Sequence, residues 1–161
     1  PEDEAKWADL HVMFATARGT VRRNSMDAFA NIPRGGKLAM RFASEEGGEE
    51  MGDRLIGVTL LTEGDDVLLA TRQGRAIRFA ATDVREFQSR TATGVRGISL
   101  QPGDEVISLS VLHGAPFDVE QRDAYLRAAP WKEGEREPSL EPATVEAMAA
   151  AEEFILTVCA N

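Results

Sequence analysis

A stretch of this chain occurs twice, 55 positions apart, and the repeat constrains the fold more than any other feature. Residues 12–23 and 67–78 share Val, Ala, Thr, Gly and the final Arg at matching positions, and the other apolar positions of the first copy stay mostly apolar in the second. A repeat of this length indicates one supersecondary unit copied along the chain. We therefore expect a modular fold of similar units.

Each copy has the pattern of a β-hairpin. In the first copy, residues 12–16 and 20–24 are short β-rich runs on either side of Gly19, and the second copy places two equivalent runs around Gly74. Glycine adopts the positive φ of a tight turn without steric cost. The sequence therefore predicts two hairpins in equivalent places.

Two further segments recur after each hairpin. Residues 36–40 match residues 94–98 as strands that begin with glycine, and residues 53–61 match residues 104–112 as apolar strands led by aspartate. Each repeat then has four short strands of β-rich composition. Four strands in about 50 residues is the size of a propeller blade.

We therefore predict an all-β fold of propeller-like blades with four antiparallel strands each. Repeats near residues 12–61 and 67–112 form two blades within residues 1–113, and residues 154–161 begin a third. Residues 114–153 break the pattern and are predicted to be a helical insertion rich in Pro, Ala and Glu.

Two helices are expected within the insertion. Residues 118–129 and 143–152 place apolar side chains near one helical face and are rich in helix-favouring residues. Tyr125, the only tyrosine of the chain, falls in the first of them. We expect its ring to pack within the insertion.

The composition is that of a globular protein without a membrane span. The 161 residues are 43% hydrophobic and 28% charged, and no apolar run approaches the length of a transmembrane helix. The single cysteine, Cys159, excludes an internal disulfide and fits a reducing cytosol. Because the chain starts without methionine and stops within an apolar run, we expect it to be a piece of a longer polypeptide.

The net charge of −9 is unevenly distributed. Residues 12–42 hold six Arg or Lys and one acid, and residues 67–100 hold six Arg and two acids. Residues 43–66 hold eight acids and one Arg, and residues 113–161 hold ten acids and four bases. The repeats are therefore basic and the segments around them acidic, so a nucleic-acid partner is compatible with the negative total.

At this level of detail the residues resemble a known family. Residues 14–23 are similar to the blade-opening hairpin of the C-terminal domain of DNA gyrase A, and residues 93–98 are similar to a Gly-Val-Arg-Gly motif that recurs in that domain. Residues 155–161 resemble the start of its next blade. The resemblance covers residues 12–113 and 154–161 in order.

The resemblance implies a β-pinwheel, a relative of the propeller in which neighbouring blades exchange strands. That domain wraps duplex DNA around a basic rim and supports negative supercoiling by an ATP-dependent type II topoisomerase. The implied partners are double-stranded DNA and, in a heterotetramer, the remainder of gyrase A together with gyrase B, in the bacterial cytoplasm at the nucleoid. Residues 33–38 resemble the family's DNA-wrapping box only in part, without its leading Gln and closing Gly, and are not assigned that role.

Arginine and lysine recur on the turns and following strands of both repeats. A curved row of such cations can hold duplex DNA through its phosphates without reading bases. Arginine suits phosphate through its planar, bidentate fork. The candidate DNA-binding residues are Arg18, Arg23, Arg34, Lys37, Arg72, Arg75, Arg78, Arg90 and Arg96.

No constellation for catalysis, metal binding or cofactor binding is found in the sequence. His11 and His113 are isolated, and one cysteine cannot build a zinc site. Asp53 and Asp104 recur at matching positions, which is the ordinary use of Asp at a turn before a strand. We therefore expect no catalytic residue, no metal and no cofactor in this chain.

Three alternatives stay open at this point. The related C-terminal domain of topoisomerase IV would bind DNA and wrap it weakly. A propeller-like scaffold would bind proteins, in which case the repeated arginines would only solubilise blade edges. An enzyme is the third class, and no group of residues supports it.

Overall fold

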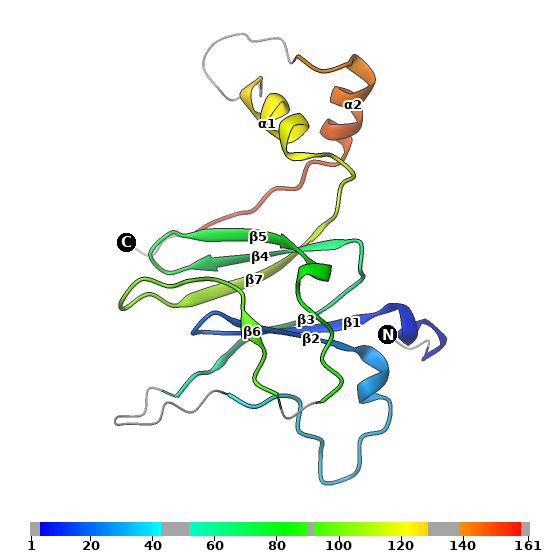
Figure 1. Cartoon of the computed structure of the whole chain (residues 1–161), viewed down its shortest axis with the longest axis vertical. Helices are drawn as coiled ribbons and strands as arrows, with labels where there is room; N and C mark the ends of the chain where they lie inside the picture. Colours follow the sequence, from blue (N-terminus) through cyan, green and yellow to red (C-terminus); the bar gives the residue numbers. More distant parts are fainter. Residues whose placement is uncertain (1–3, 43–51, 90–91, 129–138, 159–161) are drawn as a thin grey trace. The chain divides into compact units, whose positions relative to one another are not determined.

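The computed structural model describes residues 4–42, 52–89, 92–128 and 139–158, and the chain divides into two compact units, Pro1–Leu112 and His113–Asn161. Figure 1 shows the elements of both units. The strands are β1 (His11–Thr16), β2 (Thr20–Ser25), β3 (Leu55–Leu61), β4 (Asp65–Thr71), β5 (Ala76–Ala80), β6 (Val95–Arg96) and β7 (Val106–His113). The helices are the 3-10 turns η1 (Glu4–Asp9), η2 (Met26–Phe29) and η3 (Ala81–Asp83) and the α-helices α1 (Val119–Arg127) and α2 (Pro142–Ala150).

Both predicted hairpins are present, and their turns are built alike. Strands β1 and β2 pair antiparallel, as do β4 and β5. Gly19 and Gly74 both have a φ of 82°, which favours glycine. The backbone N–H of each glycine donates to the carbonyl of Thr16 or Thr71, at 3.0 and 3.1 Å. The repeat in sequence is therefore a repeat in backbone geometry.

The strands form two sheets, and one strand is exchanged between the repeats. The first sheet has the order β3-β1-β2-β6, and the second has the order β5-β4-β7. Strand β6 belongs to the second repeat but pairs with β2 of the first, with Val95 opposite Val21 and Arg96 opposite Thr20. A four-stranded blade thus takes three strands from one repeat and the fourth from the next.

Two glycines allow β6 to approach β2 closely. A Cβ atom on Gly94 would lie 2.4 Å from the carbonyl oxygen of Val21, and one on Gly97 would lie 2.7 Å from a methyl group of the same valine. Gly94 also has a φ of 122°, a conformation that residues with side chains rarely adopt. The Gly-Val-Arg-Gly motif is therefore a docking element for the preceding blade.

The strand predicted at residues 36–40 is wrong. The structure has no strand there, although Met40 is buried and packs against Val12 and Phe14. The matching segment of the second repeat forms β6 because it meets the free edge of β2. No earlier hairpin lies within the described residues to receive the first copy, and a Cβ on Gly36 would meet open space.

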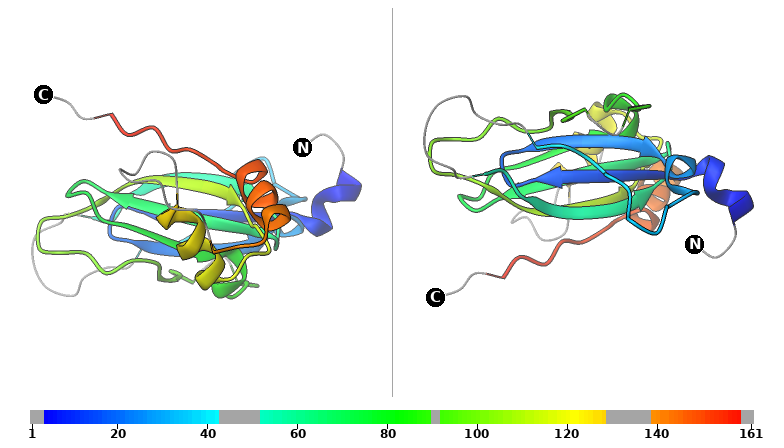
Figure 2. Two further views of the ribbon diagram at one scale, coloured as in Figure 1. Left: turned by 90° about the horizontal axis from the view of Figure 1, so that it is seen from above. Right: turned by 90° about the horizontal axis from the view of Figure 1, so that it is seen from below.

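The two sheets stack face to face and share one hydrophobic core. Figure 2 shows β1 and β2 (blue) lying over strands of the second sheet (green). The core contains Met13, Ala15, Val21, Leu61, Val67, Leu69, Ala81, Val84, Ile98 and Val106. Burying one aliphatic side chain of this kind stabilises the fold by about 1.5–3 kcal/mol. The other face of β1 is covered separately, by residues around η2 and Met40.

The outer edge of β2 is closed by residues 84–87 and by β6. Glu86 forms a parallel bridge with Arg23, the backbone N–H of Phe87 donates to the carbonyl of Arg23 at 2.8 Å, and β6 pairs farther along the same strand. The equivalent edge of β5 pairs with no other strand of the described residues. The two hairpins thus share a backbone geometry, but within the described residues only the first has its outer edge paired with another segment.

The second unit contains both helices expected from the sequence. Asp118 caps α1 by accepting from the backbone N–H of Gln121 at 2.8 Å, and Pro142 opens α2. The Tyr125 hydroxyl donates to Glu152 at 2.6 Å, which ties α1 to the end of α2. Residues 154–158 form no strand, so their assignment to a third blade stays a prediction; residues 159–161 lie outside the described residues.

Candidate nucleic-acid interface

The predicted DNA-binding residues occupy different environments. Arg90 lies outside the described residues. Arg23 is buried and Lys37 is half-buried. The exposed residues are Arg18, Arg34, Arg72, Arg75, Arg78 and Arg96. Of the predicted set, these six are accessible to a partner from solution.

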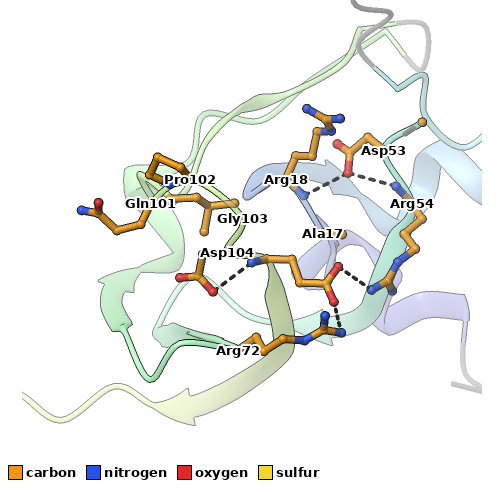
Figure 3. Close-up of a pocket in the computed structure, with 12 residues that line it drawn as sticks. Ala17, Arg18, Asp53, Arg54, Arg72, Gln101, Pro102, Gly103 and Asp104 are labelled. Carbon is orange, nitrogen blue, oxygen red and sulfur yellow. Dashed lines mark hydrogen bonds and ion pairs between the residues drawn. The ribbon is translucent and has the colours of Figure 1, made fainter. Parts of the chain in front are cut away.

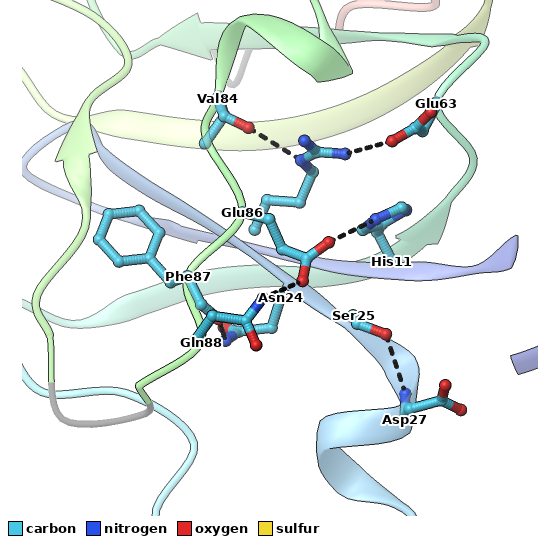
Figure 4. Close-up of polar contacts among 10 residues, drawn as sticks. His11, Asn24, Ser25, Asp27, Glu63, Val84, Glu86, Phe87 and Gln88 are labelled. Atoms are coloured by element: carbon cyan, nitrogen blue, oxygen red, sulfur yellow. Dashed lines mark hydrogen bonds and ion pairs between the residues drawn. The ribbon is translucent and has the colours of Figure 1, made fainter. Parts of the chain in front are cut away.

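Arg23 is part of the interior rather than of the surface, and two of its partners, Val84 and Glu63, are labelled in Figure 4. Arg23 is only 6% exposed. Its Nε donates to the carbonyl of Val84 at 2.8 Å, and its guanidinium lies 3.7 Å from Glu63. The burial follows from the cover that residues 84–87 place over β2. We therefore leave Arg23 out of the phosphate-contacting set.

Residues 33–38 hold one exposed and one engaged cation. The Lys37 Nζ donates to the carbonyls of Ala28 and Asn31, both at 2.9 Å, so its ammonium fastens the segment that follows η2. Arg34, three residues earlier, is exposed. Within the described part of the chain, Arg34 has no ion pair or hydrogen bond of its side chain, and the same holds for Arg96 on β6.

Arg78 and Arg75 are exposed but partly engaged. Arg78 forms an ion pair with Asp66 through two nitrogens, with Nε at 2.7 Å and a terminal nitrogen at 2.6 Å from the same oxygen. Arg75 donates to the carbonyl of Ser99 at 3.5 Å, a long contact. Exposed ion pairs of this kind contribute about 0–1 kcal/mol, so a competing phosphate can displace the acid.

Two recurring aspartates fix the hairpin turns (Figure 3). One oxygen of Asp53 accepts from the backbone N–H groups of Arg18 and Arg54, at 3.0 and 2.9 Å. In the second repeat, one oxygen of Asp104 accepts from the backbone N–H groups of Gln73 and Glu105, at 3.0 and 2.9 Å. The aspartates therefore act as structural caps that position the turns.

The pKa of Asp104 reflects this capping role. Desolvation by burial would raise it, but the hydrogen bonds from Thr71, Gln73 and Glu105, together with the nearby Arg75, lower the pKa of Asp104 below its usual value of 3.8. The carboxylate is therefore ionised at neutral pH and holds the turn firmly.

The turns of the two repeats meet at a hollow of about 630 Å³. Its lining includes Arg18 and Arg72, which lie on the two hairpin turns, and Arg54, which immediately precedes β3. Glu105 bridges two of these arginines, at 2.9 Å from Arg54 and in direct contact with Arg72. Figure 3 shows the guanidinium groups of Arg54 and Arg72 on this shared carboxylate.

Sequence reasoning missed three arginines with clear roles. Arg54 lies in the hollow, and its place after a recurring aspartate was the available signal. Arg85 is exposed and stacks 4.1 Å above the ring centroid of Phe87, a cation–aromatic pair that the sequence places two residues apart. Arg22 is fully buried, and no sequence signal separates it from its neighbour Arg23.

The isolated histidines pair with acids. His11 lies 3.1 Å from Glu86, and His113 lies 2.6 Å from Glu153. Among residues 4–42, 52–89, 92–128 and 139–158, no three His, Cys, Asp or Glu side chains form a group suited to a metal ion. In the same ranges, no helix has the length and apolarity that crossing a membrane requires.

The stacked antiparallel sheets with an exchanged strand define a repeat protein of the β-propeller class. The family described as "DNA gyrase C-terminal domain, beta-propeller" matches residues 10–47 and 65–113. This chain belongs to that family. The expected pinwheel fold, with its all-β blades and helical segment, is thereby confirmed.

Relatives identified as DNA gyrase A align along the chain. The protein of Granulibacter bethesdensis is 41% identical over 98% of this chain, and that of Rickettsia bellii is 39% identical over all of it. The Staphylococcus aureus protein is 40% identical over 68% of the chain. The chain spans about a fifth of the length of the first two relatives, 19% and 18%.

Solved structures agree on the fold. A DNA gyrase A C-terminal domain matches with a TM-score of 0.54 and 21% identity, covering 65% of this chain and 32% of its own. The C-terminal domain of a DNA topoisomerase IV matches with a TM-score of 0.57 and 20% identity, covering 66% and 31%. At these identities the likeness concerns the fold, which the two kinds of domain share.

Proposed function

We propose that this chain is a non-catalytic module that binds and wraps duplex DNA as part of DNA gyrase, and so supports ATP-dependent negative supercoiling by the whole enzyme. The observation that carries the proposal is the recurrence of an exposed arginine on the hairpin turn of each repeat, Arg18 and Arg72, in a member of the gyrase C-terminal family. Arg34, Arg75, Arg78 and Arg96 add exposed cations on the same unit.

The physical basis is phosphate attraction. Duplex DNA carries about one negative charge per 1.7 Å of axis, so spaced arginines hold it through many similar contacts. Such contacts position DNA and carry little sequence information. Bending a site of 20–30 base pairs costs about 1–6 kcal/mol, and several phosphate contacts on a rigid sheet scaffold can offset that.

The module acts in this proposal without chemistry of its own. The hydrogen bond with Glu152 raises the pKa of Tyr125 to about 12, which opposes formation of a nucleophilic phenolate. The proposed partners are double-stranded DNA, the remainder of gyrase A, and gyrase B, joined in a heterotetramer in the bacterial cytoplasm. No cofactor is assigned to this chain.

Duplex binding by charge-reversed variants tests the proposal. The variant Arg34→Glu/Arg96→Glu removes two exposed cations from the first unit, and Arg122→Glu/Arg127→Glu makes the same change of charge on α1. We expect the first variant to bind a fluorescein-labelled duplex at least tenfold more weakly by anisotropy, and the α1 control to lose much less. Equal losses in both variants would show that net charge alone matters and would overturn the proposal.

A further inference from the structure

The hollow between the hairpin turns contains one carboxylate shared by two arginines. The Glu105 Oε2 lies 2.9 Å from a terminal nitrogen of Arg54, and its other oxygen contacts a terminal nitrogen of Arg72. The carboxylate side chain is 24% exposed, whereas the side chains of Arg54 and Arg72 are 57% and 66% exposed. The acid is thus the sheltered member of the group, and both cations face solvent.

The neighbouring acids are committed elsewhere. One oxygen of Asp53 and one of Asp104 each accept two backbone N–H groups of the turns. Within the described residues, Glu105 is the acid that forms an ion pair with Arg54 and with Arg72. The charge on these two guanidinium groups is therefore balanced mainly by one side chain.

The arginines retain donors for a further anion. A guanidinium has five N–H donors in a fixed fork, and the contacts with Glu105 engage only one terminal nitrogen of each arginine. Arg18 reaches the same hollow from the first turn. A backbone phosphate presents two anionic oxygens, as a carboxylate does, and suits such forks.

We propose that this hollow is a binding site for a phosphate of the DNA backbone, and that Glu105 competes with the phosphate for Arg54 and Arg72. The inference rests on the proposed DNA-binding function and assigns one backbone phosphate to a specific position on the first unit. In the absence of DNA, Glu105 holds the two arginines in place. Because exposed ion pairs are weak, a phosphate backed by neighbouring contacts displaces the carboxylate.

The competition predicts an unusual direction for one substitution. Glu105→Gln keeps the side-chain length and leaves its backbone contacts with Asp104 and Arg72 intact. We expect this variant to bind a fluorescein-labelled duplex about threefold more tightly than the unmodified chain, since the competing charge is gone. The matched control is Glu63→Gln, which removes the same charge from an exposed side chain that pairs with Arg23.

A double-mutant cycle separates competition from net charge. In a chain that already carries Arg54→Gln and Arg72→Gln, the Glu105→Gln substitution should give no gain in affinity. Thermal unfolding of each variant checks that the turns remain folded. Three results would overturn the site while duplex binding stands. They are an equal gain in affinity for Glu63→Gln and Glu105→Gln, a gain that persists without the two arginines, and weaker duplex binding by Glu105→Gln. Failure of the unmodified chain to bind the duplex at low salt would overturn the proposed function itself.

Discussion

Arg22 shows how strongly the role of one arginine depends on its surroundings. Its side chain is fully buried, its Nε donates to Asn24 at 2.8 Å, and its terminal nitrogens contact the carbonyls of Ser89 and Ala92. The guanidinium also lies 5.6 Å from the ring centroid of Phe87. This basic residue of the first repeat therefore holds the two repeats together through buried hydrogen bonds.

Replacing this arginine should destabilise the first unit. Arg22→Met keeps much of the apolar volume but leaves buried carbonyls without their donor, at a cost of about 2–4 kcal/mol in the free energy of unfolding. Urea unfolding measures the change. The matched control is Arg85→Met, whose exposed guanidinium lies over the same Phe87 ring and should cost below about 1 kcal/mol. Equal losses in the free energy of unfolding for the two variants would contradict the structural role of Arg22.

The sequence could not separate buried from exposed arginines. Arg23 and Arg78 stand at the same place in the two repeats, and the pattern predicts the same role for both. In the structure Arg23 is covered by residues 84–87, whereas Arg78 is exposed and pairs with Asp66. The difference comes from a segment that lies far from Arg23 in sequence, which no local pattern describes.

At the scale of elements, the hairpins and helices were predicted from the sequence because each depends on residues that are close together in the chain. Gly19 and Gly74 identified both hairpins because a tight turn needs positive φ. The helices α1 and α2 followed from composition and from apolar residues spaced for one helical face. The strand partner of β6 was not predictable from the pattern, because pairing between repeats depends on which edge is free.

The link between α1 and the residues after α2 predicts a specific pH response. Because the hydrogen bond with Glu152 raises the pKa of Tyr125 to about 12, the contact is complete below pH 10 and is lost as the pH rises through 12. Tyr125 is the only tyrosine, so tyrosinate absorbance in an alkaline titration reports it alone. Glu152→Gln should move the midpoint toward 10. A midpoint near 10 in the unmodified chain would contradict the link.

At the scale of the whole molecule, the uneven charge reconciles a net charge of −9 with a DNA partner. Six of the predicted DNA-binding arginines are exposed on the described sheet unit, whereas acids outnumber bases ten to four in residues 113–161. Attraction to DNA is set by the local field of a surface rather than by the total charge. In the proposed function, the basic repeats contact the duplex and the acidic segments limit where it lies.

The most direct test of duplex binding through phosphates is the salt dependence of the dissociation constant for two unrelated duplex sequences. Binding through phosphates predicts one shared slope of log affinity against log salt. Its magnitude falls by about 0.9 for each phosphate-contacting arginine changed to glutamine, with Arg34 and Arg96 as the first two positions. A slope near zero, or slopes that differ between the two sequences, would contradict binding through the DNA backbone.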